Sequence, residues 1–350
     1  MLDRDLSAMF RRLIRETGPI SLAQYMGESN ARYYSSRDPL GTGGDFITAP
    51  EISQMFGELI GLWLADMWAQ MGGPAHVYYV ELGPGRGTLA SDALRTAARF
   101  GLDPQVHFVE GSESLRAIQS GTMPGVIHHD DLASLPDDAP ILLVANEFFD
   151  ALPIRQLVRT DKGWRERMVG LDGERFIFVA GDKPMDDAVP ESARDAEPGS
   201  LIETSPAAST VMGEIASRLA GQGGAGLVID YGARKLRPGS TLQAIRAHKK
   251  VDVFAAPGEA DLTAHVDFSL LNQVAQNHKA NVLGIARQGQ WLRRLGIDAR
   301  LEALQAASAE NAEKLQRQRD RLVEAEQMGD LFKVMALSGG GWPERGGGFA

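Results

Sequence analysis

The fold of this chain is decided by the ten residues YVELGPGRGT, positions 79–88. The apolar run before the glycines predicts a β-strand over 77–82, and the pattern after them predicts a helix over 88–100. Glycine permits left-handed backbone and close approach of a ligand, and the first N–H groups of a helix are unpaired. A dinucleotide loop needs Gly-x-Gly-x-x-Gly, but here the third glycine comes one place early and Thr88 takes its position. A Walker loop would need Gly-Lys-Ser/Thr, which is missing, so the loop is typical of neither class.

Strands and helices alternate through the middle of the chain. Further strands are expected over 106–110, 126–128, 141–145, 226–231, 281–287 and 331–337, with a second helix over 112–119. This βαβ alternation predicts a parallel sheet with helices on both faces, which is a doubly wound α/β fold.

The pattern also predicts the domain organisation. Residues 1–73 are expected to form an N-terminal helical or lid region. Residues 74–350 are expected to form the ligand-binding domain, with insertions around 155–205 and 233–280. Length alone agrees with one large domain that carries insertions.

Four segments outside the core have their own signatures. Residues 30–45 are rich in Gly, Ser, Arg and Tyr and predict a loop, and a helix is expected to start at Pro50. Residues 155–180 predict two or three antiparallel strands, followed by an acidic, Pro-rich linker. A long polar helix is expected over 298–328, and then a mobile glycine-rich tail.

Composition excludes several classes of protein. The formal net charge is −10, which disfavours a nucleic-acid partner because phosphate binding needs a basic surface. The chain has no cysteine, so disulfides, cysteine zinc sites and thiol nucleophiles are excluded together. No apolar run is long enough for a signal peptide at the N-terminus or for a membrane span. We therefore expect a cytoplasmic protein.

An acidic residue precedes the loop, and three glycines follow it at two-residue spacing: Glu81, then Gly83, Gly85 and Gly87. This pattern resembles the first motif of class I methyltransferases, which bind S-adenosyl-L-methionine. That cofactor has no pyrophosphate, and it carries a sulfonium and an α-amino group. A carboxylate at Glu81 would attract these cations, where it would repel a phosphate.

The next two strands also end in acidic residues. Glu110 follows the second strand, where a carboxylate can accept both ribose hydroxyls, as in dinucleotide folds. After the third strand come His128, His129, Asp130 and Asp131. We favour Asp131 as the partner of the adenine amino group. A metal site is not expected, because adjacent residues on a strand point to opposite sides.

Four separated motifs resemble the MidA family of S-adenosylmethionine-dependent methyltransferases. They are GDFITAPEISQMFGE (44–58), ELGPGRG (81–87), NEFFDALP (146–153) and DLTAHVDF (261–268). The resemblance covers about 18–337 and implies a class I, Rossmann-like sheet of seven strands with the last strand antiparallel, plus inserts. The family's mitochondrial members resemble protein arginine methyltransferases that are needed for assembly of respiratory complex I. A protein substrate with an arginine acceptor is therefore expected.

The motif after the fourth strand supplies the candidate catalytic groups. A guanidinium acceptor needs carboxylates to hold it, and Glu147 and Asp150 lie at the strand edge where open α/β sheets bind ligands. Asn146 could bind polar groups of the cofactor or of the acceptor, and we favour the cofactor. His265 is the candidate imidazole base, although a lone histidine is more often a packed residue.

Some roles and functions stay open from sequence. Asp45, Thr48 and Glu51 suit either a lid over the cofactor or a simple helix start, and Asp230 or Tyr231 could border the acceptor. The acceptor could instead be another protein residue or a small molecule. A non-catalytic assembly chaperone that keeps the cofactor fold is the third hypothesis. The intact residues Glu81, Gly83, Gly85, Gly87 and Glu110 favour an enzyme over that chaperone.

Overall fold

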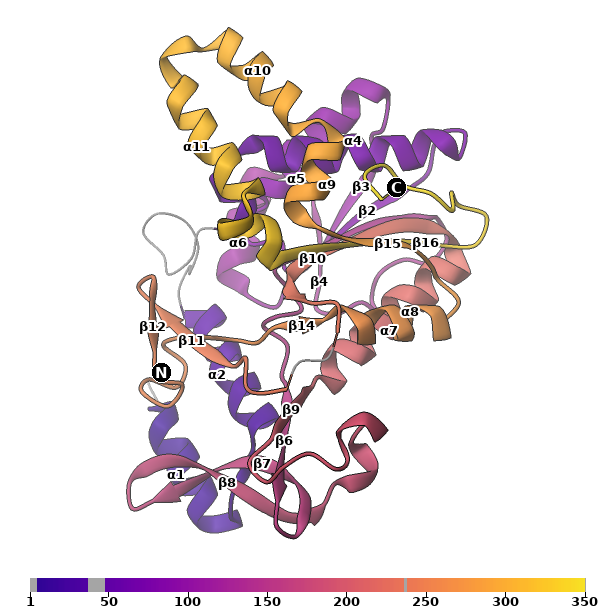
Figure 1. Ribbon diagram of the computed structural model, residues 1–350. Helices are drawn as coiled ribbons and strands as arrows, with labels where there is room; N and C mark the ends of the chain where they lie inside the picture. The colour runs from indigo at the N-terminus through magenta and orange to yellow at the C-terminus, as the bar shows by residue number, and fades with distance from the viewer. Residues whose placement is uncertain (1–4, 37–47, 236–237, 350) are drawn as a thin grey trace. The chain divides into compact units, whose positions relative to one another are not determined.

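The computed structural model describes residues 5–36, 48–235 and 238–349 (Figure 1). The chain divides into two compact units. The larger unit consists of Asp38–Phe149, Val211–Arg234 and Phe268–Ala350. The smaller unit consists of Met1–Arg37, Asp150–Thr210 and Lys235–Asp267, so it combines the N-terminal helices with the regions where insertions are expected.

The larger unit is built on a mixed sheet. Its strands follow one another in the order β15 (Asn281–Arg287), β16 (Phe332–Ser338), β10 (Gly224–Ala233), β5 (Ile141–Asn146), β2 (Tyr78–Leu82), β3 (Gln105–Val109), β4 (Ile127–His129). The neighbours from β10 to β4 are parallel, and β16 is antiparallel to both β10 and β15. The central strands β2 and β5 are buried along their whole length, because helices cover both faces.

Nine helices of the described chain lie wholly or partly in this unit. They are α3 (Ala49–Ile52), α4 (Gln54–Gln70), α5 (Thr88–Ala97), α6 (Glu113–Thr122), α7 (Pro206–Gln222), α8 (Phe268–Asn277), α9 (Gln288–Leu295), α10 (Ile297–Ala307) and α11 (Ala312–Val323). The main core joins α4 and α5 to the apolar face of the sheet. Gly61 allows the two helices to approach closely, since a β-carbon at this position would overlap the carbonyl group of Ala93. Phe56 and Trp63 of α4 are core residues.

The smaller unit is mostly antiparallel. Its helices are α1 (Leu6–Thr17) and α2 (Leu22–Ser36). One sheet has the order β1 (Ile20–Ser21), β7 (Gly163–Asp172), β6 (Arg155–Thr160), β9 (Leu201–Thr204), with β8 (Arg175–Pro184) paired to β7. A second sheet has the order β12 (Lys249–Val251), β11 (Gln243–Arg246), β13 (Asp261–Thr263). Aromatic rings fill the core of the smaller unit, among them Phe10, Tyr25, Phe176 and Phe254.

Three expectations about single segments are wrong. Helix α2 continues to Ser36, through part of the predicted loop, because Tyr33 is buried and the Asn30 amide bonds the carbonyls of Ala151 and Leu262. The rest of that loop, 37–45, lies outside the described residues. The predicted long helix breaks at Ser308, which has extended φ of −149°, into the packed pair α10 and α11. The C-terminal tail is held in place, since Trp342 is buried and Trp291 bonds the Gly347 carbonyl.

Candidate active site

The glycine loop lies between β2 and α5 and has left-handed backbone at each glycine. The φ angles are 59° at Gly83, 56° at Gly85 and 79° at Gly87. Gly87 N donates to the Pro84 carbonyl at 2.8 Å, which closes the turn directly before helix α5. Other residue types adopt this backbone only with strain, so backbone conformation favours glycine at all three positions.

Glu81 is the last but one residue of β2 and is 2% exposed. Its Oε2 accepts a hydrogen bond from the Tyr79 hydroxyl at 2.7 Å. Burial raises the pKa of the Glu81 carboxyl to about 8, and the Tyr79 bond lowers it only partly. A positively charged ligand group near Glu81 would therefore favour loss of the Glu81 proton, and the resulting carboxylate would attract that group.

Glu110 directly follows β3, and each of its carboxylate oxygens already has a partner. Oε1 accepts from Ser112 N at 2.8 Å, and Oε2 accepts from the Gln119 amide at 3.2 Å. Burial raises the pKa of Glu110, and these hydrogen bonds act in the opposite direction. The Arg116 guanidinium donates to the Glu110 backbone carbonyl at 2.7 Å and so fixes the strand end as well.

Gln119 and Arg116 were not predicted as site residues. Both lie on α6, where Leu115 and Gln119, four positions apart, are the buried residues. A polar residue at a core position of an amphipathic helix is the signal that sequence reasoning could have used. Arg116 also bonds the His129 carbonyl and the Asp130 carboxylate, so it joins the ends of β3 and β4.

The polar residues at the carboxyl end of β4 and just after it each have different partners. His128 contacts Gln119, His129 lies 2.8 Å from His107 Nδ1, and Asp131 Oδ1 accepts from Ser134 N at 2.9 Å. Hydrogen bonds from Ser134 lower the pKa of Asp131, which stays an exposed carboxylate. Within the described ranges, no group of three or more His, Asp or Glu side chains is placed to hold a metal ion.

The end of β5 brings Asn146 and Glu147 to the same edge of the sheet. Glu147 has a left-handed φ of 51°, and its N–H donates to the Ile229 carbonyl at 2.8 Å. Its Oε1 accepts from Ala49 N at 3.0 Å and from the Asn146 amide at 3.3 Å. Non-glycine residues in this region of backbone space are strained and concentrate at functional sites.

Asn146 gives the clearest indication of the kind of group that this site would bind. It is 9% exposed, and its Oδ1 has no hydrogen-bond partner. The register pairs Glu81 with Val144, so Asn146, two residues further along β5, faces the same side of the sheet as Glu81. A buried acceptor and a buried acid on one face fit a ligand that carries N–H donors and positive charge, such as an α-amino group.

The short helix α3 lies over this edge and contacts both loops. Its N-cap residue Thr48 makes no side-chain capping bond, and Glu147 caps the amide of Ala49 instead. Glu51 Oε1 accepts a 2.6 Å hydrogen bond from Thr88, the first residue of α5. The structure thus joins the segment around Pro50 to the glycine loop, while Asp45 lies outside the described residues.

The remaining candidates divide between the two units. Asp230, in the larger unit, is fully buried and accepts from the backbone N–H groups of Phe149 and Tyr231, both at 2.9 Å. Asp150 and His265 belong to the smaller unit, where Ala264 N donates to the Asp150 carbonyl at 3.0 Å. That bond makes Asp150 and His265 near neighbours within the smaller unit.

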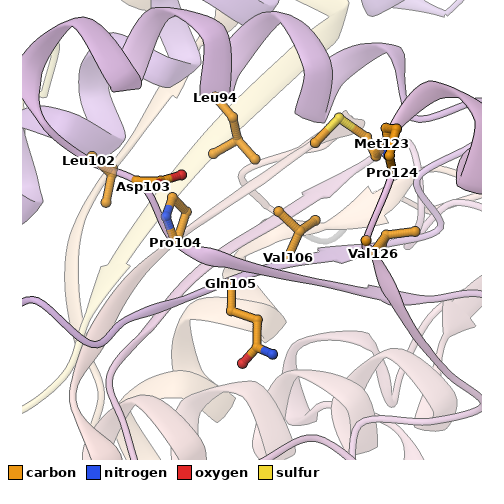
Figure 2. Close-up of a pocket in the computed structure, with 10 residues that line it drawn as sticks. Leu94, Leu102, Asp103, Pro104, Gln105, Val106, Met123, Pro124 and Val126 are labelled. Carbon is orange, nitrogen blue, oxygen red and sulfur yellow. The ribbon is translucent and has the colours of Figure 1, made fainter.

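A cavity of about 300 Å³ lies elsewhere. Figure 2 shows residues that line it. Its walls include Leu94, Gln105, Val106, Met123 and Val126. Gln105 and Val106 begin β3 and Val126 directly precedes β4, whereas Glu110 and Asp131 follow the carboxyl ends of those strands. The cavity is therefore not the space between the glycine loop and Glu110.

Comparisons with known proteins show which family this chain resembles. A family model of S-adenosyl-L-methionine-dependent methyltransferases matches residues 59–286, more than half of the chain. The chain is 37% identical over 379 residues to "Protein arginine methyltransferase NDUFAF7, mitochondrial" from Homo sapiens, covering 96% of this chain and 84% of that protein. The same protein from Xenopus tropicalis is 36% identical over 363 residues, covering 93% and 83%.

A solved structure shares the fold. The crystal structure of a protein from Burkholderia thailandensis bound to S-adenosyl-homocysteine superimposes with a TM-score of 0.82 at 29% identity. The match covers 95% of this chain and 91% of that chain. S-adenosyl-L-methionine is accordingly the cofactor of this methyltransferase fold.

The expectation of a cytoplasmic protein is contradicted by these relatives, whose names place them in mitochondria. Composition and net charge indicate only that a protein surface faces water. The cytoplasm and the mitochondrial interior are both aqueous, so composition and charge could not distinguish between them. Among the described helices, none has both the length and the apolar character to cross a membrane. By its family model and its relatives, the chain belongs to the MidA family of S-adenosylmethionine-dependent methyltransferases.

Proposed function

We propose that this protein methylates an arginine of a protein substrate. Support comes from relatives named as protein arginine methyltransferases at 36–37% identity over more than nine-tenths of the chain. Within the site, the observation that carries the proposal is the half-buried Glu147, a carboxylate in left-handed backbone at the end of a central strand. The adjacent strand β2 carries the glycine loop, so Glu147 is well placed for a group that meets the cofactor.

The residues proposed to bind the cofactor surround the carboxyl ends of β2 to β5. They are Glu81, Gly83, Gly85, Gly87, Glu110, Asp131 and Asn146. Glu81 and Asn146 would hold the α-amino end, Glu110 the ribose hydroxyls and Asp131 the adenine amino group. The chemistry of each group supports its role, since carboxylate and amide oxygens accept hydrogen bonds from N–H and O–H donors.

The proposed chemistry needs positioning more than acid–base power. Bound cofactor supplies a methyl group that its sulfonium already activates. Glu147 would pair with the guanidinium of the acceptor in bidentate fashion and fix its approach. Proton removal by Asp150 or His265 stays a prediction for each residue separately.

The proposal extends to the finer fold and to the partner. The sheet of the larger unit would correspond to the seven-stranded class I sheet, with insertions around 155–205 and 233–280 in a domain spanning 74–350. A link to assembly of respiratory complex I, which the family resemblance implies, is part of the same proposal.

The function can be tested by following the methyl group. Purified protein is incubated with tritium-labelled S-adenosyl-L-methionine and an extract from cells that lack it, and labelled protein bands are hydrolysed to amino acids. We expect the label in methylated arginine. Label in another amino acid or in the small-molecule fraction would replace arginine as the acceptor, and cofactor binding without any transfer would indicate a non-catalytic chaperone.

A further inference from the structure

Gln119 is a fully buried amide that joins three parts of the site. It is 0% exposed and lies in α6. Its Nε2 donates to the Gly85 carbonyl at 2.8 Å and to Glu110 Oε2 at 3.2 Å. One amide nitrogen thus contacts both the glycine loop and the carboxylate after β3.

The surrounding groups fix which way this amide points. A carbonyl oxygen and a carboxylate oxygen only accept hydrogen bonds, so the Gln119 nitrogen must face them. The Gln119 oxygen then faces His128 Nε2 at 3.0 Å, and that ring nitrogen must carry hydrogen. Burial and the nearby Arg116 lower the pKa of His128, in keeping with a neutral ring that donates from Nε2.

Packing alone does not explain a glutamine here. The position four residues before it, Leu115, is buried and apolar, and a leucine at position 119 would need no hydrogen-bond partners. A buried amide is tolerated because all of its polar atoms are paired, and losing one partner would be costly. The polar side chain therefore has a task that an apolar one could not perform.

That task concerns the Glu110 carboxylate. Ser112 N binds Oε1 and Gln119 binds Oε2, so the carboxylate has one protein partner on each oxygen. An ionised carboxylate has about four acceptor positions, which leaves room for two more donors. With both oxygens held, Glu110 is fixed in one orientation before any ligand arrives, and no ordering of its side chain is needed on binding.

We propose that Gln119 is a positioning residue for the ribose end of the cofactor, acting through Glu110 and the Gly85 carbonyl. The inference rests on the proposed assignment of Glu110 to the ribose hydroxyls, and it goes beyond that assignment by naming what makes Glu110 competent. His128 holds the Gln119 amide in this orientation through its contact with the amide oxygen. The neighbouring histidine, His129, belongs to a separate pair with His107.

A ligand pair separates this role from simple packing. Calorimetry measures the affinity for S-adenosylhomocysteine and for its 2′-deoxy analogue, in the wild type and in Gln119→Leu. We expect the wild type to lose affinity when the hydroxyl is removed, by roughly 10- to 100-fold, the scale of a hydrogen bond to a charged group. In Gln119→Leu the parent ligand should weaken by a similar factor, and the further loss with the deoxy analogue should shrink to a few-fold.

Two controls keep the test decisive. Gln288 is another fully buried glutamine of the larger unit, bonded to the Leu322 carbonyl, and Gln288→Leu should leave the hydroxyl preference unchanged. Gln119→Asn keeps an amide but is one methylene shorter, and it replaces Gln119→Leu if the latter does not fold by circular dichroism. It should also lose the preference.

The possible outcomes distinguish failure of the Gln119 inference from failure of the proposed function on which it rests. Equal weakening of both ligands in the Gln119 variants would make the residue purely structural and overturn the inference. Unchanged affinity of Glu110→Ala for S-adenosylhomocysteine would instead remove the ribose assignment itself. Neither result would bear on the proposed methylation of arginine, because both experiments measure only the binding of S-adenosylhomocysteine.

Discussion

Two stretches of the same sheet edge differ in how completely their polar atoms are paired. After β3, the Glu110 carboxylate and the Gln119 amide have a protein partner on every oxygen and nitrogen. Around β2 and β5, Asn146 Oδ1 is buried without a partner, and the buried Glu81 has a raised pKa. Glu147 adds left-handed backbone to the second stretch.

This difference in pairing suggests that the region after β3 is preformed, whereas the region around β2 and β5 is completed by its ligand. Unpaired buried acceptors and strained backbone carry a free-energy cost, and they persist at sites where function requires them. The ribose end is thus expected to bind a rigid, neutral part of the ligand with little rearrangement. The end near β5 is expected to receive the charged groups and the reacting atoms.

The largest expected effect comes from the loop that both stretches share. Gly85→Val should abolish detectable cofactor binding, because a β-branched residue is strongly disfavoured at a φ of 56°. Calorimetry with S-adenosylhomocysteine measures the loss. Gly173, in a turn of the smaller unit, has a similar φ of 60° and open space around it, so Gly173→Val is the matched control and should keep binding. Unchanged affinity in Gly85→Val would falsify the loop assignment.

The second effect separates transfer from binding at the β5 end. Glu147→Gln keeps an oxygen that can accept from Ala49 N but removes the charge that would hold a guanidinium. We expect cofactor affinity within a few-fold of the wild type and a loss of about a hundredfold in methyl transfer, the cost of a misplaced reactant. Glu147→Asp should recover only part of the activity, because its shorter side chain shifts the carboxylate.

Two results would argue against this assignment of Glu147. Transfer at the wild-type rate in Glu147→Gln would remove the main support for a guanidinium partner at this position. Loss of cofactor binding would instead place Glu147 in the donor region, together with Asn146. The initial rate of label transfer and the calorimetric affinity, measured on the same preparation, separate these outcomes.

The third effect tests the preformed stretch directly. Glu110→Ala should weaken cofactor binding by roughly 10- to 100-fold, since it removes a charged hydrogen-bond acceptor, takes away the acceptor of Ser112 N and leaves the Gln119 amide with one bond fewer. Glu110→Gln should lose less, because one oxygen can still accept from a hydroxyl. Affinity equal to the wild type in Glu110→Ala would move the ribose site elsewhere.

Sequence predicted the local elements of this molecule well and their long-range pairings poorly. The glycine loop and the buried strands follow from periodicity and turn chemistry within short windows. Helix α2 could not be extended to Ser36 from sequence, because the Asn30 amide that anchors it bonds residues more than 100 positions away. The break at Ser308 depends on packing of α10 against α11, which the polar pattern does not encode.

The same limit explains the residues that were missed at the site. Glu81 and Glu110 stand at strand ends, where the motif itself indicates a role. Gln119 is recognised only when α6 is placed against the loop, since its partners Gly85 and Glu110 come from two other connections. Glu51 acquires its bond to Thr88 in the same way, through helix packing and not through spacing.

The smallest expected effect is a pH dependence of cofactor affinity that involves only the incomplete stretch. Glu81 faces the apolar neighbours Phe108 and Val144 on the adjacent strands, and burial raises its pKa from 4.5 to about 8. The free protein therefore holds a protonated Glu81 at neutral pH, while a cationic ligand favours the carboxylate, so binding should release a proton. Affinity should rise by less than tenfold between pH 7 and 8 and level off above the pKa.

The sign for stability is opposite to the sign for affinity. A carboxyl whose pKa is raised on folding retains its proton in the folded state after the unfolded chain has lost it. The free energy of unfolding of the free protein should therefore fall as pH rises from about 4.5 towards 8 through this group. Glu81→Gln keeps an acceptor for Tyr79 but cannot titrate, so both slopes should flatten in that variant. Calorimetry in buffers of different ionisation enthalpy counts the released protons, and an unchanged count in Glu81→Gln would assign the proton to another group and erase the contrast between the two stretches.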